Sequence, residues 1–118
     1  MNDPYQERFS GISRLYGDLG AHALRGAHVA VIGIGGVGSW CAEALARTGL
    51  GEITLVDLDD ICISNTNRQI HTLSQTVGQS KVKVMAERLR MINPECHLNA
   101  ESYFLTDKTL ERDRKSVV

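Results

Sequence analysis

The stretch from His28 to Asp60 constrains the fold more than any other part of the chain. An apolar, β-branched run from Val29 to Ile32 leads into a glycine-rich turn, and a helical pattern then continues to Thr48. A second apolar run ends at Asp57. The order of strand, glycine loop, helix, strand and acid predicts one mononucleotide-binding βαβ unit within an α/β, Rossmann-like fold.

The glycines of this turn have separate physical roles. Gly33 ends the strand and permits a tight turn because it has no Cβ. Gly35 and Gly36 allow the backbone to come close to a phosphate, and Gly38 allows the next helix to pack closely on the strand. The helix expected over residues 37–48 directs free N–H groups and the positive end of its dipole toward the loop. The turn therefore predicts an anion site.

Asp57 lies at the tip of the second predicted strand. A carboxylate in that position can accept hydrogen bonds from the hydroxyls of a ribose. The unit does not decide which nucleotide binds, because a dinucleotide such as NAD and a mononucleotide such as ATP use the same cradle. The neighbouring residues have to discriminate between them.

Composition excludes several classes of protein. The chain has 118 residues and a net charge of −1, so it lacks the overall basic field that is typical of nucleic-acid-binding domains. No run is apolar enough to span a membrane, and the first residues lack the apolar core of a signal peptide. Cys41, Cys62 and Cys96 form no C-x-x-C pair and predict reduced thiols in a cytoplasmic protein, with Cys41 on the inner face of its helix.

The rest of the chain predicts few further elements. Residues 1–6 are expected to form a loose tail, and residues 7–24 one helix or two short ones interrupted by glycines. Residues 81–92 predict an amphipathic helix, residues 96–104 a third strand, and residues 106–110 the start of another helix.

This pattern divides the chain into an N-terminal helical arm, residues 1–25, and a nucleotide-binding domain, residues 26–118. A doubly wound sheet usually has five or more strands, whereas only about three are predicted here. We therefore expect the N-terminal part of a longer, truncated domain with a mostly parallel but incomplete sheet.

A polar stretch from Ser64 to Gln69 follows the second strand and is expected beside the nucleotide. Within it, Arg68 is suited to clamp a phosphate through two parallel N–H bonds. Lys81 stands in the first turn of its predicted helix, where the dipole disfavours a cation, which indicates that it faces a ligand anion. His71 is predicted to be structural or exposed rather than catalytic.

These motifs together resemble the ubiquitin-activating-enzyme-like (ThiF) superfamily, which includes the adenylyltransferases of thiamin and molybdopterin synthesis. The shared features are the loop from Gly33 to Ser39, the acid Asp57, the Asn67-Arg68-Gln69 string and the G-x-x-K motif that ends at Lys81. The strings at 65–71 and 92–96 are most similar to the tRNA threonylcarbamoyladenosine dehydratase branch.

The resemblance implies ATP-dependent activation of a carboxylate as an acyl-adenylate. In the dehydratase branch that carboxylate is the threonylcarbamoyl group on a tRNA adenosine, which then cyclises with loss of water. The resemblance also implies Mg²⁺ as a cofactor, with its main protein ligand beyond the end of this chain, so no metal ligand is assigned here. The implied partners are ATP, tRNA, a second copy in a homodimer, and sulfur-relay proteins.

The same resemblance implies two sets of site residues. The catalytic set is Arg68, Lys81 and Arg14, the last contributed by a neighbouring subunit. The nucleotide-binding set is Gly33, Gly35, Gly36, Gly38, Asp57, Asp59, Ser64, Asn65, Asn67, Arg68, Gln69 and Lys81. Two alternatives remain open, an NAD-binding Rossmann oxidoreductase and an enzyme that adenylates the C-terminal glycine of a ubiquitin-like sulfur carrier.

Overall fold

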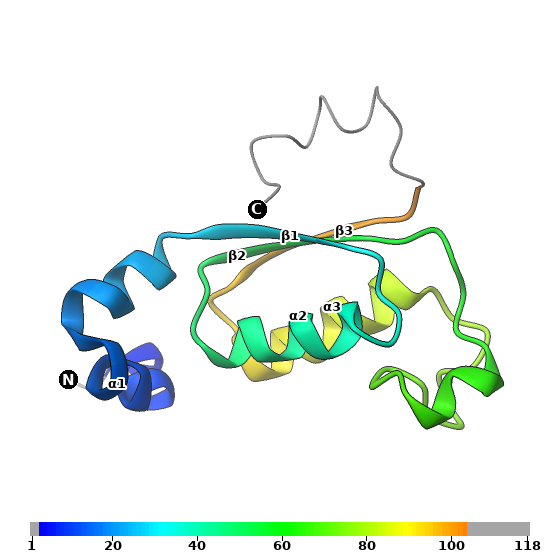
Figure 1. Cartoon of the computed structure of the whole chain (residues 1–118), viewed down its shortest axis with the longest axis horizontal. Coiled ribbons are helices and arrows are strands. Elements are labelled where there is room, and N and C mark those ends of the chain that lie inside the picture. The colour runs from blue at the N-terminus through cyan, green and yellow to red at the C-terminus, as the bar shows by residue number, and fades with distance from the viewer. Residues whose placement is uncertain (1–2, 104–118) are drawn as a thin grey trace.

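The computed structural model describes residues 3–103 of the chain. Three parallel strands form one sheet in the order β1-β2-β3, and α2 and α3 both lie on the same face of it (Figure 1). In chain order, the elements are α1 (Pro4–Arg25), β1 (His28–Ile32), α2 (Gly38–Arg47), β2 (Glu52–Val56), the 3-10 helix η1 (Ile63–Asn67), α3 (Lys81–Ile92) and β3 (His97–Glu101). This arrangement confirms the predicted Rossmann-like α/β fold.

The core lies between the sheet and its two helices. The apolar side chains of alternate strand residues, such as Ile53 and Leu55 on β2, point toward the helices and are fully buried. The small residue Ala42 on α2 allows close approach to the sheet, while Met85 and Leu89 on α3 fill the space with larger side chains. Burial of each such large side chain contributes about 1.5–3 kcal/mol to folding.

Side chains at both ends of α3 fix its position. The Ser80 side chain caps the start of α3 by accepting a hydrogen bond from the Lys83 N–H. At the other end Asn93 is 1% exposed, and its Nδ2 donates to the Ala46 and Leu50 carbonyls at 3.3 and 3.0 Å. The end of α3 is thereby fixed to the end of α2.

The helix of the N-terminal arm begins earlier than predicted. The predicted loose tail over residues 1–6 is wrong for residues 4–6, because Asp3 caps α1 and the helix starts at Pro4. The rings of Tyr5 and Phe9, 4.9 Å apart, are buried and therefore order this segment. Non-helical backbone at Phe9 and at Gly17, where φ is +78°, interrupts the helix and supports the prediction of more than one short helix.

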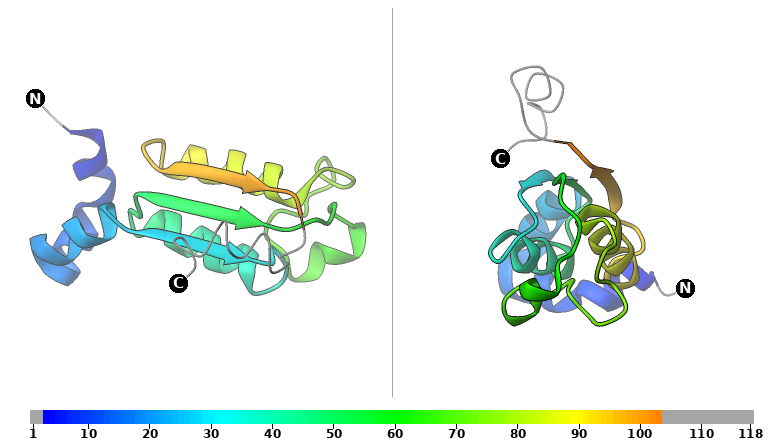
Figure 2. Two further views of the ribbon diagram at one scale, coloured as in Figure 1. Left: turned by 90° about the horizontal axis from the view of Figure 1, so that it is seen from above. Right: turned by 90° about the vertical axis from the view of Figure 1, so that its right-hand side faces the viewer.

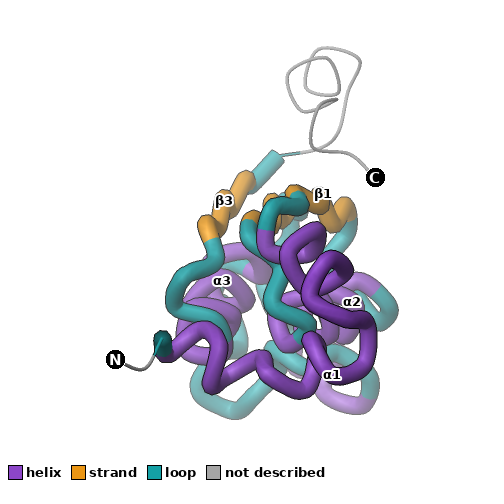
Figure 3. Tube along the Cα trace, turned by 90° about the vertical axis from the view of Figure 1, so that its left-hand side faces the viewer, coloured by secondary structure: helices purple, strands orange, loops and turns teal. Residues whose placement is uncertain are grey.

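The arm lies at the amino-terminal ends of the strands. Viewed from above, α1 stands at one end of the sheet and the loops that follow β1 and β2 lie at the other (Figure 2). Seen from the arm side, the strands form one layer and the helices a second (Figure 3). The carboxyl ends of the strands, where parallel sheets bind ligands, are therefore far from the arm.

Two further predictions need correction. Cys41 is exposed, because α2 turns Ala42 and Ala46 toward the sheet and the neighbouring position faces outward; Cys96 is the buried thiol. The third strand ends at Glu101 instead of residue 104. The helix predicted over residues 106–110 lies outside the described residues. Between residues 3 and 103, no helix is long and apolar enough to cross a membrane.

Candidate functional site

The backbone of the loop after β1 requires glycine at two positions. Gly33 adopts φ of +90°, and its N–H donates to the Val56 carbonyl at 2.8 Å. A Cβ at Gly38 would stand 1.7 Å from the Gly33 carbonyl oxygen, so no other residue fits there without backbone movement. The loop therefore crosses closely over the end of β2 and leads directly into α2, as predicted.

Asp57 connects the tip of β2 to this loop. Its Oδ2 accepts the Ile34 N–H at 2.7 Å, and its Oδ1 accepts the Asp59 N–H at 2.8 Å. An ionised carboxylate has about four acceptor positions, so two remain for a ligand. The half-buried side chain lines a cavity of about 220 Å³ together with residues of both strand ends and Tyr103.

His71 holds the opposite side of the same loop, as the prediction of a structural histidine allowed. It is 1% exposed, and its Nε2 lies 2.8 Å from the Ile34 carbonyl oxygen, which can only accept. Burial lowers the pKa of His71, and the nearby Lys81 charge lowers it further. The neutral ring therefore donates from Nε2, while Nδ1 accepts from the Thr72 hydroxyl at 3.2 Å.

The polar stretch after β2 forms η1 and then turns back over the glycine loop. Asn65 is buried, and its Oδ1 accepts the Cys62 N–H at 2.9 Å, so it caps η1 instead of facing open space. Asn67 is exposed, and its Oδ1 accepts from Arg68 at 3.0 Å. The structure thus gives Asn65 a structural role that the predicted binding role did not include.

Arg68 stands over Gly36. A Cβ built at Gly36 would lie 3.7 Å from Cγ and Cδ of the arginine. The backbone carbonyl of Arg68 accepts from Trp40 Nε1 at 2.9 Å, and its guanidinium also donates to the Ser64 carbonyl at 3.2 Å. Trp40 was not predicted as a site residue; it anchors Arg68 across 28 positions of sequence, and no local pattern signals that contact.

Gln69 lies beside Gly35. Its Nε2 is 3.7 Å from where a Gly35 Cβ would stand, and the residue is 6% exposed. Its buried Oε1 has no hydrogen-bond partner among residues 3–103. An unsatisfied buried acceptor costs about 1–3 kcal/mol, so a donor that reached this atom would be stabilising.

Lys81 begins α3 and is 7% exposed. In the described part of the chain its ammonium group makes no hydrogen bond and no ion pair. Its charge nevertheless helps to lower the pKa of two neighbours, His71 and Cys62. The predicted cation therefore lies at the carboxyl ends of the strands without an ion pair in the described chain.

Not all of the predicted site residues lie together at the carboxyl ends of the strands. Arg14 is exposed on α1, and α1 lies at the opposite end of the sheet from the loops that follow β1 and β2 (Figure 2). Asp59 and Ser64 are exposed near the strand tip. Within one chain the structure thus brings together the loop, Asp57, Arg68, Gln69 and Lys81, and leaves Arg14 apart.

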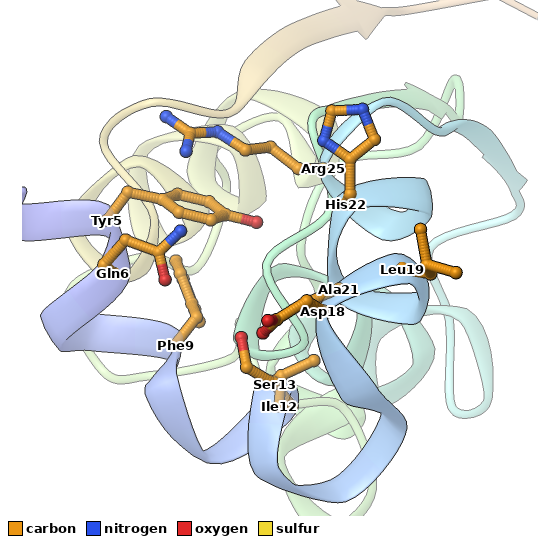
Figure 4. Close-up of a pocket in the computed structure, with 10 residues that line it drawn as sticks. All are labelled: Tyr5, Gln6, Phe9, Ile12, Ser13, Asp18, Leu19, Ala21, His22 and Arg25. Carbon is orange, nitrogen blue, oxygen red and sulfur yellow. The ribbon is translucent and has the colours of Figure 1, made fainter.

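Another cavity of the described chain lies away from this cluster. The hollow in Figure 4, about 360 Å³, is formed within α1, with Arg25 above Tyr5 and with Phe9 and Asp18 on its sides. Arg25 stacks on the Tyr5 ring at 3.9 Å and forms long ion pairs with Asp3 and Glu95. None of the predicted site residues lines it, and the charge of Arg25 is already paired.

The sequence profile of the ThiF family matches residues 8–117. This chain belongs to the ThiF family. It is 56% identical over 106 residues to the tRNA threonylcarbamoyladenosine dehydratase of Escherichia coli K12, a match that covers 90% of this chain and 40% of that protein. The corresponding protein of Bacillus subtilis is 50% identical, with 89% and 41% covered. The chain thus spans about 40% of the length of these ThiF relatives.

Other relatives and solved structures agree with that assignment. The molybdopterin-synthase adenylyltransferase of E. coli is 36% identical over 77% of this chain and 36% of that protein. The E. coli dehydratase crystallised in complex with ATP has a TM-score of 0.93 and 52% identity, covering 97% of this chain and 47% of that one. The same enzyme with AMP gives 0.94 and 51%. The predicted resemblance is therefore confirmed at the level of family and fold.

Proposed function

We propose that this ThiF-family chain carries the nucleotide-binding half of a site for ATP-dependent adenylation of a carboxylate. The observation that carries the proposal is the pair of cations around the glycine loop. Arg68 lies over Gly36, and Lys81 is buried without a partner within residues 3–103. A polyphosphate supplies the negative charge that this arrangement lacks.

The proposal assigns each part of the site a role toward ATP. The loop from Gly33 to Gly38 and the start of α2 lie along the phosphates, where free N–H groups favour an anion. Asp57 uses its remaining acceptor positions for the ribose hydroxyls. Gln69 and the exposed Ser64, Asn67 and Asp59 border the nucleotide, whereas Asn65 shapes the loop that carries them.

In the reaction, an oxygen of the substrate carboxylate attacks the α-phosphorus of ATP. The bond from that phosphorus to the bridging oxygen breaks, and pyrophosphate leaves with the electron pair. Negative charge grows on the α-phosphoryl oxygens and on the leaving group. Lys81 and Arg68 stabilise that charge, and their fixed positions make this stabilisation effective in the transition state.

The substrate we propose is the threonylcarbamoyl group of tRNA threonylcarbamoyladenosine, which cyclises with loss of water. Support comes from the name and 56% identity of the E. coli relative. We also propose a second copy of the chain as a functional partner, because the family resemblance assigns Arg14 to the site whereas α1, which carries Arg14, lies at the other end of the sheet.

The fit to a magnesium ion is poor in the described residues. No group of three His, Cys, Asp or Glu side chains between residues 3 and 103 could hold a metal. Asp59 is an exposed carboxylate near the strand tip. We therefore assign no protein ligand to Mg²⁺ here and derive no step through it.

Calorimetric titration tests nucleotide choice. The chain is expected to bind ATP and to give no heat with NAD. Lys81→Met and Arg68→Ala should each weaken ATP binding by about 30-fold or more, since each removes a charge partner of the phosphates. Lys83→Met, an exposed lysine on the same helix, is the matched control and should bind as the parent does. Tight NAD binding without a response to ATP would reject the proposal.

Pyrophosphate release tests which carboxylate the enzyme adenylates. Full turnover is expected with tRNA that carries threonylcarbamoyladenosine, and none with a ubiquitin-like protein ending in glycine. Because the relatives are longer, the assay is made on the chain alone and on the same residues joined to the remainder of the E. coli dehydratase. Release driven by the ubiquitin-like protein and not by tRNA would replace the proposed acceptor with a sulfur carrier.

A further inference from the structure

Cys62 is an exposed thiol held in a polar setting next to the candidate site. Its Sγ accepts a hydrogen bond from the Ser64 hydroxyl at 3.3 Å, and the Asn65 N–H also points at the Cys62 side chain. Both contacts favour a sulfur that carries negative charge, because each places a donor on it. The side chain is open to solvent, so a small reagent can reach it.

The cation of Lys81 lies close to this thiol. Short backbone contacts fix the two segments side by side: the Ile61 N–H donates to the Gln79 carbonyl at 2.8 Å, and the Lys81 N–H to the Asp59 carbonyl at 3.2 Å. The hydrogen bond from Ser64, contacts to backbone N–H groups and the Lys81 charge together lower the pKa of Cys62. The buried lysine, unpaired within residues 3–103, is thus the second feature that points to an anion at this place.

The other two cysteines provide an internal comparison. Cys41 is also exposed, but residues 3–103 offer its sulfur no hydrogen bond. Cys96 is buried, and burial raises its pKa to about 11. A thiolate, not a thiol, is the nucleophile, so the three positions should differ strongly in reactivity.

We propose that Cys62 is a modification site, a thiolate that reacts with peroxides and other small electrophiles and that an anion bound at Lys81 protects. In the reaction with hydrogen peroxide, the sulfur attacks one oxygen and the O–O bond breaks. A sulfenic acid forms and hydroxide leaves, so the sulfur is oxidised by two electrons and the peroxide is reduced. The protection by ATP rests on the proposed function; the reactivity of the thiol does not.

The test measures the modification rate of each cysteine in the folded chain. Iodoacetamide at pH 7 with peptide mass mapping should modify Cys62 about tenfold faster than Cys41, and Cys96 slowest. Hydrogen peroxide with dimedone should label the same cysteine first. In concentrated urea the three rates should converge. Equal rates for Cys62 and Cys41 in the folded chain would overturn the inference.

Two variants separate the two causes of the high reactivity of Cys62. Lys81→Met removes the cation, and Ser64→Ala removes the hydroxyl donor; each should slow the modification of Cys62 several-fold and leave Cys41 unchanged. Lys83→Met is the control and should alter neither rate. Because the Ser64 hydroxyl is exposed, that variant keeps the test valid if Lys81→Met fails to fold. An unchanged Cys62 rate in both variants would refute the assigned cause.

ATP and inorganic triphosphate are then added at saturating concentration. Both should slow the modification of Cys62 and not that of Cys41, because a phosphate at Lys81 neutralises the cation. ATP binding by calorimetry without any slowing would contradict the shared position of the thiol and the anion. A fast, lysine-dependent Cys62 in a chain that binds no ATP would support the thiol site and reject the proposed function.

Discussion

Glu43 and Lys81 are two equally buried charged residues, of which only Glu43 forms ion pairs in the described chain. Each is 7% exposed. Between α2 and α3, Glu43 accepts from Arg88 at 2.7 and 3.2 Å and from Arg47 at 2.9 Å. At the strand tips, Lys81 forms no ion pair in the described chain. We propose that the paired Glu43 serves stability and that the unpaired Lys81 serves the ligand of the proposed function.

The titration of Glu43 reflects this pairing. Burial alone would raise its pKa, but the hydrogen bonds from Arg88 and Arg47 outweigh that cost and hold the pKa below its ordinary value. A lowered carboxyl pKa contributes stability above the unfolded value, near 4.3, and that contribution is lost as the pH falls through the folded pKa. Glu43 thus belongs to the structural framework that positions the site.

Breaking the pair should give the largest loss of stability. In Arg88→Ala the Glu43 carboxylate stays buried with a single partner, so the free energy of unfolding should fall. Loss of a buried partner costs 3–5 kcal/mol, and because the Arg88 side chain is 35% exposed we expect about 2 kcal/mol. Urea denaturation measures it. The control is Arg90→Ala, an exposed arginine on the same helix; an equal loss there would mean that the pairing is not the cause.

Lowering the pH should cause a second, smaller loss of stability, through His71 at the site. The pKa of His71 is lowered in the folded chain, so the unfolded chain binds more protons as the pH falls below about 6.5. The free energy of unfolding should therefore decrease from pH 7 toward pH 5, by less than about 1.4 kcal/mol per pH unit. His71→Gln should have a flatter profile. A profile as steep as that of the parent would show that another group titrates.

Removal of the unpaired cation should leave stability intact. Lys81→Met deletes a charge that forms no ion pair in the described chain, so the chain should be at least as stable as the parent in urea. The pKa of His71 should rise in the same variant, because the Lys81 charge helps to lower it; NMR titration of the ring measures this. A clear loss of stability, absent in Lys83→Met, would mean that Lys81 serves the fold.

The sequence predicted the parts of the fold that follow from local pattern. Alternation and apolar runs placed β1 and β2, and the glycine spacing placed the loop between Gly33 and Gly38, where a Cβ would meet backbone. The family pattern indicated Arg68 and Lys81. Contacts between distant segments escaped prediction, including Trp40 with Arg68, His71 with Ile34 and the packing of Tyr5 that orders the arm.

The sequence by itself determined a strand–glycine loop–helix–strand unit with two cations following it, because backbone sterics and periodicity act over a few residues. Tertiary structure decided which charges are compensated. Lys81 stands in the first turn of its helix and Glu43 four residues before Arg47, but neither local pattern shows whether the charge is paired across the fold. Only the packing of α2 against α3 brings Arg88 to Glu43, and only the crossing of the loops at the strand tips leaves Lys81 buried beside His71 and Cys62.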